Sequence, residues 1–425
     1  MIGRTSVPVS RLTESRGATA FRHRNYRIFF SGQAVSLVGT WMQQVAQAWL
    51  VLQLTGDPFW LGIVAAAQFI PVMILGLFAG VAADALPKRQ TLVATQTAMM
   101  TLAAILAVLT LTGTVQVWMI LVLAILLGCA NAVDMPVRQS FAIELVGRED
   151  VGNAVALNSA MFNGSRIVGP ALAGLTIAAF GVGAAFVMNA LSFLAVIIAL
   201  LAMDDATLRT PKRMARPHSA GEVIENLAEG LGYVRHTPLV LLAVLVVGGV
   251  ATFGMNFNVL MPAFAKDDLA SGAAGYGFLM AASGLGALFA ALGLAFRGRP
   301  RTSRMATGAI ILGLASIALA ATNTYVLAFA LMILTGYGGI SMAATANTTI
   351  QLAVPDALRG RVMSVYTTIF ASSTPVGGLM MGAIASSAGT ATAIALGGVL
   401  SALVGVAAAV WLRGRRRPEA VTAAA

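Results

Sequence analysis

Residues 90–133 read QTLVATQTAMMTLAAILAVLTLTGTVQVWMILVLAILLGCANAV and contain no Asp, Glu, Lys or Arg. A helix that crosses the hydrocarbon core of a bilayer needs about 20 predominantly apolar residues. The run is long enough for two such helices, and Thr112, Gly113 and Thr114 supply turn-forming residues near its middle. This stretch therefore predicts a helical hairpin that crosses a membrane twice.

Comparable runs fill most of the remaining chain. Those with the length of one helix are 28–56, 58–83, 237–265 and 269–296. Those with double length are 305–355, 362–412 and 151–203, the last interrupted only by Arg166. Turn-forming residues divide the double runs at 322–324, 386–390 and 181–183. With 58% hydrophobic and 10% charged residues, the chain is predicted to be an all-α membrane protein with twelve transmembrane helices.

The positive charges alternate along the chain. Of the 27 Lys and Arg residues, 25 lie before the first predicted helix, after the last, or in alternate loops, and Lys266 is the one cation in an opposite loop. Cytoplasmic loops of membrane proteins carry such an excess of Lys and Arg. We therefore expect both termini and the central linker in the cytoplasm. The formal charge of +11 then reflects membrane topology, and no binding to nucleic acid is expected.

A polar segment divides the predicted helices into two sets of six. We expect a cytoplasmic arm at 1–27, an N-terminal bundle at 28–203, a linker at 204–236, a C-terminal bundle at 237–412 and a cytoplasmic tail at 413–425. In the linker, Ser219 and Glu222 fit a capping box, and apolar residues recur after them at helical spacing. This pattern favours a helix that lies on the cytoplasmic leaflet, with a flexible tether as the alternative.

The two halves match weakly at an offset of 208 residues. Gly169 and Gly174 in helix five align with Gly377 and Gly382 in helix eleven. Secondary transporters are commonly built from repeats, so the match indicates a duplicated six-helix unit.

Residues 80–89, GVAADALPKR, resemble the signature of the major facilitator superfamily between helices two and three. In that signature a glycine is followed by an aspartate and then by a basic pair. Glycines let membrane helices approach closely, and an acid beside two bases can lock or release a gate. Asp134 and Arg138, one helical turn apart, are expected to pair near this loop. The predicted inner gate comprises Gly76, Gly80, Asp84, Lys88, Arg89, Asp134 and Arg138.

Residues 164–174, GSRIVGPALAG, look like the Gly-Pro antiporter motif of drug exporters in that superfamily. Pro170 removes a backbone hydrogen bond and the glycines narrow the helix, which permits a bend and close packing. Together with segments at 134–159 and 359–364, the motif is similar to the branch that includes the enterobactin exporter and related multidrug exporters. Its residues here are Gly164, Arg166, Gly169, Pro170 and Gly174.

The resemblance implies the major facilitator fold, in which two six-helix bundles are related by pseudo-two-fold symmetry and alternate access to a midplane site. It also implies a monomer in the bacterial inner membrane that exports a small drug-like or siderophore-like molecule by proton antiport. Residues 293–301 lack the aspartate of the signature, so Asp84 would act without a symmetric partner. Uptake or facilitated passage through the same fold is one alternative, and a non-transporting membrane receptor is another.

Polar side chains at helical spacing in a membrane helix usually face protein or water. Helix one carries five on one face, and helices five, seven and ten carry others. The alternative for each is a hydrogen bond between helices without ligand contact. The predicted substrate pathway consists of Gln33, Ser36, Thr40, Gln44, Gln47, Asn158, Asn163, Arg166, Asn256, Asn258, Tyr337, Ser341, Thr345 and Asn347.

Two charged residues lie inside predicted spans and need a reason to be there. A charge in hydrocarbon costs at least about 2.5–3.5 kcal/mol, so Arg166 is expected to serve function. Exporters of cationic drugs need negative charge, and Asp134 is the only acid inside a predicted span. We therefore expect a neutral or anionic substrate with Arg166 as its counter-charge. Asp134 is the candidate for proton coupling, with gate stabilisation as the alternative.

Other chemistries lack their residues. The sequence contains no glycine-rich loop ending in Lys-Ser or Lys-Thr, so ATP-driven pumping is not expected. The three histidines, His23, His218 and His236, are scattered in cytoplasmic segments, so no metal site is expected. We expect neither catalysis nor a cofactor.

Overall fold

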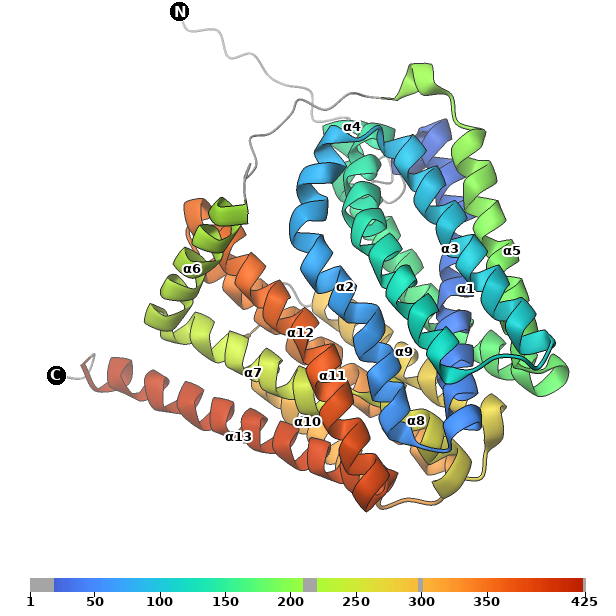
Figure 1. Cartoon of the computed structure of the whole chain (residues 1–425). Coiled ribbons are helices and arrows are strands. Elements are labelled where there is room, and N and C mark those ends of the chain that lie inside the picture. The colour runs from blue at the N-terminus through green and yellow to red at the C-terminus, as the bar shows by residue number, and fades with distance from the viewer. Residues whose placement is uncertain (1–18, 209–219, 297–300, 423–425) are drawn as a thin grey trace, which may run out of the picture.

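The computed structural model describes residues 19–208, 220–296 and 301–422, and within them it contains helices and no strands (Figure 1). The first half contains α1 (Arg24–Thr55), α2 (Pro58–Ala85), α3 (Lys88–Leu111), α4 (Val117–Phe180) and α5 (Val182–Leu201), with the short η1 (Thr19–Arg22) and η2 (Asp205–Thr207). The second half contains α6 (Ala220–His236), α7 (Pro238–Gly254), α8 (Phe257–Ala263), η3 (Phe264–Asp268), α9 (Gly272–Phe296), α10 (Ser303–Ala320), α11 (Tyr325–Ala353), α12 (Asp356–Ala388) and α13 (Thr390–Thr422).

Helix α4 is two membrane helices joined by a sharp turn. Its 64 residues would extend about 96 Å if straight, three times the thickness of the hydrocarbon core. At Gly147 the backbone leaves helical geometry, with φ 76° and ψ 176°. Ile120 near one end and Ile177 near the other lie in the same buried cluster, so the chain folds back at Gly147. We refer to the two parts as α4a (117–146) and α4b (148–180).

The predicted number of membrane helices is confirmed in the described residues. Ten helical segments are long and apolar enough to cross a membrane, and one of them is α4, which counts twice. Helices α7 and α8 with η3 form one of the ten, 238–268. Helix α1 adds the twelfth crossing, because it packs along α4 and α5 although its polar residues lower its hydropathy. The turns predicted at 112–114, 181–183, 322–324 and 386–390 all separate observed helices.

The two halves are joined at one end and separate at the other. One buried cluster contains residues of both halves, including Trp49 and Tyr276, whose rings stack at 6.1 Å. A second cluster contains only residues of the first half, and a third only residues of the second half. These separate clusters lie toward the end that carries η1, α6 and the end of α13, and Figure 1 shows the halves diverging there. We call this the basic end and the other the joined end.

The contacts of four glycines show that the two halves are related by pseudo-two-fold symmetry. A Cβ at Gly169 in α4b would lie 2.8 Å from a carbonyl oxygen of α1, and one at Gly377 in α12 would lie 2.1 Å from a carbonyl oxygen of α7. Gly174 likewise approaches α9 of the other half, and Gly382 approaches α2. Each contact of α4b thus has its counterpart on α12, with the two halves exchanged, at the predicted 208-residue offset.

The linker is anchored at both flanks. After α5, the backbone N–H of Asp204 donates to the side-chain oxygen of Asn25, and the Asp204 carbonyl oxygen accepts from the Asn25 side-chain amide, which ties this segment to α1. Helix α6 packs on α12, where Glu229 pairs with Arg361 and Gly230 approaches the Arg361 carbonyl. The predicted capping pair lies outside the described part, since Ser219 and the Glu222 side chain are not described.

Candidate functional site

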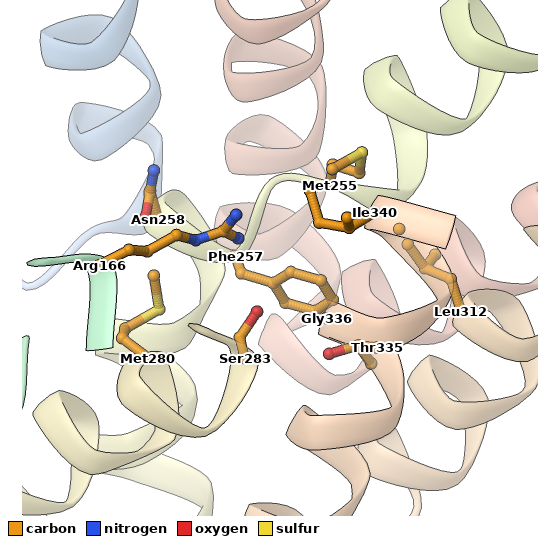
Figure 2. A pocket seen from close by; sticks show the side chains of 11 residues that line it. Arg166, Met255, Phe257, Asn258, Met280, Ser283, Leu312, Thr335, Gly336 and Ile340 are labelled. Atoms are coloured by element: carbon orange, nitrogen blue, oxygen red, sulfur yellow. The ribbon is translucent and has the colours of Figure 1, made fainter. Parts of the chain in front are cut away.

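A cavity lies where α4b meets the second half (Figure 2). Its walls come from α4b, the α7–α8 junction, α9, α10 and α11. At that junction Met255 and Asn256 leave helical geometry, so the seventh span is interrupted within the bundle. Interrupted membrane helices are tolerated where the backbone is buried in protein or lines a cavity. The lining residues are Arg166, Met255, Phe257, Asn258, Met280, Ser283, Leu312, Thr335, Gly336, Gly339 and Ile340.

Arg166 is the first half's contribution to this cavity. Its backbone is held close to α9, because a Cβ at Gly284 would lie 3.0 Å from the Arg166 carbonyl oxygen. In Figure 2 its side chain extends from α4b into the cavity, with Met280 and Ser283 near it. Arg166 is partly buried, and it forms no ion pair or hydrogen bond with another residue that the structure describes.

The antiporter-like motif fixes this placement. Gly169 packs against Trp41 and Val38 of α1, while Gly174 packs against the start of α9. The backbone of Pro170 in turn lies against Gly277. Helix α4b is therefore wedged between its own half and the other. Gly164 differs, since no described atom lies within 4 Å of the position of a Cβ there.

The five polar residues predicted to form a stripe on one face of α1 differ in how deeply they are buried. Gln33, Ser36 and Gln47 are buried, Gln44 is partly buried and Thr40 is exposed. The Gln33 side-chain oxygen has no hydrogen-bond partner within the described residues, although it is buried.

Helix α1 also carries a polar contact that was not predicted. Gln43, adjacent to the stripe, accepts a hydrogen bond from Asn189 of α5. Because the two residues are 146 positions apart, only the three-dimensional structure reveals their contact.

The remaining pathway candidates are spread along the bundle. Asn258 and Arg166 line the cavity. Asn158 accepts a hydrogen bond from Tyr26, while Asn163 and Asn256 donate to carbonyl oxygens one turn earlier in their own chain segments. On α11, Ser341 and Thr345 are buried, Tyr337 and Asn347 are partly buried, and Asn347 accepts a hydrogen bond from Gln351.

Several residues that line the cavity were not predicted from the sequence. Ser283 and Thr335 are small hydroxyl residues in glycine-rich helices, where such residues usually serve helix packing. Met255, Phe257 and Met280 are apolar and could not be distinguished from lipid-facing side chains. For Met255 and Phe257 the missing signal was the interruption of the seventh span, and for Met280 it was the packing of α9 against α4b.

The predicted pair in α4a is present and belongs to a larger cluster. Asp134 is fully buried, and its Oδ2 lies 3.2 Å from Nη2 of Arg138, within ion-pair range but without hydrogen-bond geometry. Its Oδ1 accepts hydrogen bonds from Thr95 at 2.9 Å and from Gln96 at 2.8 Å, both on α3. Asp134 therefore links α3 to α4a.

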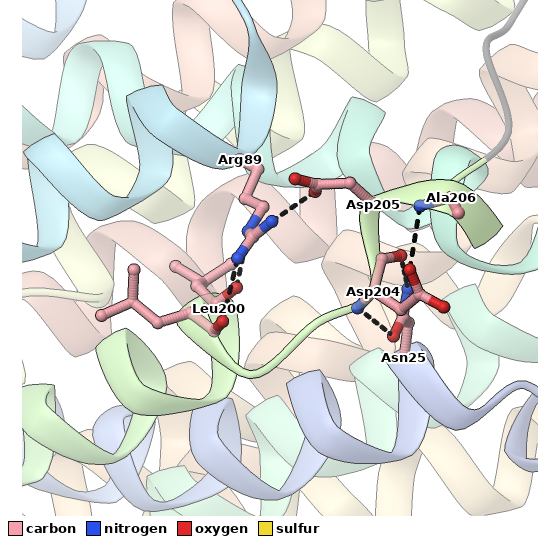
Figure 3. Close-up of polar contacts among 7 residues, drawn as sticks. Asn25, Arg89, Leu200, Asp204, Asp205 and Ala206 are labelled. Carbon is pink, nitrogen blue, oxygen red and sulfur yellow. Dashed lines mark hydrogen bonds and ion pairs between the residues drawn. The ribbon is translucent and has the colours of Figure 1, made fainter.

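The basic pair after α2 contacts other elements of the first half. Lys88 pairs with Glu144 of α4a. Arg89 donates to the last carbonyl oxygens of α5, at 2.7 Å to Leu200 and 2.9 Å to Leu201, and pairs with Asp205 (Figure 3).

The structure describes only part of the loop signature. The side chains of residues 77–85 are not described, so the predicted roles of Gly80 and Asp84 lie outside the described part. No described atom lies within 4 Å of the position of a Cβ at Gly76.

Residues 15–422 match the family described as transmembrane secretion effector. The chain belongs to this family of major facilitator transporters. Multidrug efflux pump Tap of Mycolicibacterium fortuitum is 31% identical over 363 residues, which cover 83% of this chain and 87% of that protein. Staphyloferrin A transporter of Staphylococcus aureus is 29% identical over 191 residues, 45% of this chain and 48% of that protein.

Solved structures agree on the fold of this transporter. A bacterial homologue of the human lysosomal transporter Spinster superposes with a TM-score of 0.68 at 14% identity, covering 93% of this chain and 96% of that chain. The peptide transporter POT gives 0.74 at 11% identity, covering 91% and 94%. The chain is therefore a multi-pass membrane transporter with the major facilitator fold, and not an enzyme.

Proposed function

We propose that this transporter exports a small amphipathic molecule, neutral or anionic, from the bacterial cytoplasm by alternating access. The observation that carries the proposal is the cavity that Arg166 of one half shares with four helices of the other. A site formed by both halves changes shape when they rock against each other, and this is the requirement for alternating access.

The sidedness of the structure supports loading from the cytoplasm. The basic end carries the Lys- and Arg-rich loops, which the positive-inside rule assigns to the cytoplasm together with both termini. The halves are separate at this end and joined at the other. The two halves are thus separate on the face from which an exported substrate would enter, although the cavity itself must widen to hold it. We propose 28–203 and 237–412 as the two bundles that move as units, within a monomer.

Protons are proposed as the coupling ion. Asp134 is the one acidic side chain among the fully buried residues that the structure describes. Acidic residues inside membrane helices commonly serve in proton relays. We propose that Asp134 carries the coupled proton and that its contacts with Thr95, Gln96 and Arg138 hold the inner gate.

The relatives favour export over uptake. The named functions of Tap and of the staphyloferrin A transporter are multidrug efflux and siderophore transport.

The cavity of about 60 Å³ is smaller than the roughly 300–1,000 Å³ typical of small-molecule sites. Substrate binding therefore requires a wider arrangement of the two halves than the one described.

The test is substrate accumulation in cells that lack their own exporters. The protein is expressed as wild type, as Asp134→Asn and as Cys129→Ser, which serves as a control outside the proposed machinery. Fluorescent drugs and siderophores are measured inside the cells with and without a proton uncoupler. We expect wild type and the control to lower accumulation until the uncoupler is added, and Asp134→Asn to fail. Higher accumulation with the protein than without it would instead establish uptake.

A further inference from the structure

The cavity offers an unusual set of hydrogen-bond donors. Arg166, Asn258 and Ser283 line it, and none of the three side chains has a hydrogen bond or ion pair with another described residue. Ser283 is 3% exposed. Thr335 differs, because its hydroxyl donates to the Met332 carbonyl at 2.8 Å. Ser283 is buried, and Arg166 and Asn258 are partly buried. Three donors from α4b, α8 and α9 that face one cavity without a described partner suit a ligand that supplies acceptors.

The charge of the cavity determines whether an anionic or a cationic ligand is favoured. None of its described lining residues is Asp or Glu, and Arg166 is the only charged one. A guanidinium presents several N–H donors in a planar fork that matches a carboxylate or similar oxyanion. A cationic ligand would face an unpaired arginine without any compensating acid, so the cavity disfavours it.

The rest of the wall is apolar. Met255, Phe257, Met280 and Leu312 surround the polar groups. Methionine is flexible and polarizable, and it adapts to apolar ligands of different shape. The wall therefore suits a hydrocarbon or aromatic body attached to the anionic group.

We propose that the Arg166 cavity is the binding site for amphipathic organic anions, with a carboxylate or sulfonate on Arg166, Asn258 and Ser283 and the apolar body against the methionine-rich wall. This rests on the proposed function and narrows its substrate class. Because Arg166 belongs to the first half and its partners to the second, the anion connects the two halves directly.

The test compares three probes that share one apolar body. Pyrenebutyrate is the anion, its primary amide is neutral, and pyrenylbutyl-trimethylammonium is the cation. Binding to purified protein in phosphatidylcholine nanodiscs is followed by fluorescence anisotropy, so no anionic lipid competes. We expect the anion to bind at least about tenfold more tightly than the amide, as hydrogen bonds to charged groups predict, and the cation to bind more weakly than either.

Variants locate the preference. Arg166→Gln is expected to reduce anion affinity to that of the amide and to leave the amide unchanged, while Arg166→Lys retains part of the preference. Arg304→Gln removes a cation outside the cavity and is expected to retain all of it, which controls for net charge. If Arg166→Gln does not fold, Asn258→Asp gives the same test, since an isosteric carboxylate beside Arg166 should occupy it and remove the preference.

Equal affinities for the three probes in wild type overturn the proposal, as does an anion preference that survives both Arg166→Gln and Asn258→Asp. These outcomes are separate from those of the cellular test. If neutral or cationic compounds are exported and Arg166→Gln does not affect this export, the proposal of export stands and that of an anion site fails. An Arg166-dependent anion preference in a protein that does not lower accumulation in cells would keep the site and reject the exporter.

Discussion

Asp134 and Arg138 form an unequal pair. The Asp134 side chain is 0% exposed, whereas that of Arg138 is 27% exposed. Loss of the aspartate leaves a cation that can still reach water, but loss of the arginine leaves a carboxylate in the interior. Removing one partner of a buried pair typically costs about 3–5 kcal/mol, because the remaining charge is uncompensated.

We therefore predict that Arg138→Gln destabilises the protein more than Asp134→Asn. The double variant should be more stable than Arg138→Gln alone, since it leaves no buried charge. Thermal unfolding of the three purified variants in one detergent measures the order. Equal losses for both single variants, with additive loss in the double variant, would show that the pair contributes nothing as a pair.

Arg89 illustrates a contact that depends on side-chain geometry. Its fork reaches two carbonyl oxygens at the end of α5 and also Asp205, and the planar guanidinium makes these contacts together. We predict that Arg89→Lys lowers the midpoint of thermal unfolding although the charge is kept. Arg304→Lys is the matched control, and a similar decrease in both variants would contradict the capping role.

At the residue scale the sequence predicts only what is local. The Asp134–Arg138 pair follows from a spacing of four within one helix. Thr95 and Gln96, which hold the other oxygen of Asp134, lie on another helix 39 and 38 positions away. No spacing rule connects them, so this part of the cluster required the structure.

Among the elements, the crossing of α12 with α7 depends on a single glycine. Gly377 and Gly378 are neighbours in α12 with opposite surroundings. A Cβ at Gly377 would lie 2.1 Å from the Thr252 carbonyl oxygen, whereas at Gly378 the nearest atom would be 3.5 Å away. Space for a Cβ is thus lacking at only one of these two adjacent positions.

We predict that Gly377→Ala destabilises the protein by about 1–3 kcal/mol, the usual cost of overpacking, because α7 must move away from α12. Gly378→Ala should leave stability and transport unchanged. Thermal unfolding and cellular accumulation of the two variants provide the comparison. Tolerance of Gly377→Ala would mean that the α7–α12 crossing is looser than described.

The helix ends could be predicted from the sequence, but the interruption between α7 and α8 could not. Turn-forming residues marked four helix ends because Gly and Thr break apolar runs locally. The interruption at Met255 and Asn256 has no proline, and its single polar residue also fits an unbroken helix. Packing of the surrounding helices decides it.

For the whole molecule, the proposed alternating access requires the contact between halves at the joined end to open during transport. A Cβ at Gly382 of α12 would lie 3.3 Å from the Cα of Phe59 in α2, which is within reach of a disulfide. We predict that Gly382→Cys with Phe59→Cys, in a Cys129→Ser background, forms a cross-link that stops transport until a reductant is added.

A protease site inserted between the halves makes the cross-link visible, since cleaved halves then migrate together only when bonded. Glu149→Cys with Ala357→Cys, exposed positions at the basic end, serves as the control pair and should remain unlinked. Normal transport by the fully cross-linked protein would rule out opening at the joined end.

Twelve crossings and two halves could be predicted because both are recorded in charge-free runs and in the polar linker. The conformation could not. It depends on which ends of the halves share a buried cluster, and the same sequence must support at least two such arrangements in an alternating-access carrier.

Arg166, which pairs with no residue that the structure describes, also has an electrical consequence. An empty carrier holds a positive charge within the bilayer, whereas a carrier loaded with one anion is neutral there. A membrane potential of 100 mV, negative inside, is worth up to about 2.3 kcal/mol for a unit charge that crosses the whole field. The field would therefore pull the empty site back toward the cytoplasm and do no work on the loaded one, so that voltage alone favours outward movement of anions.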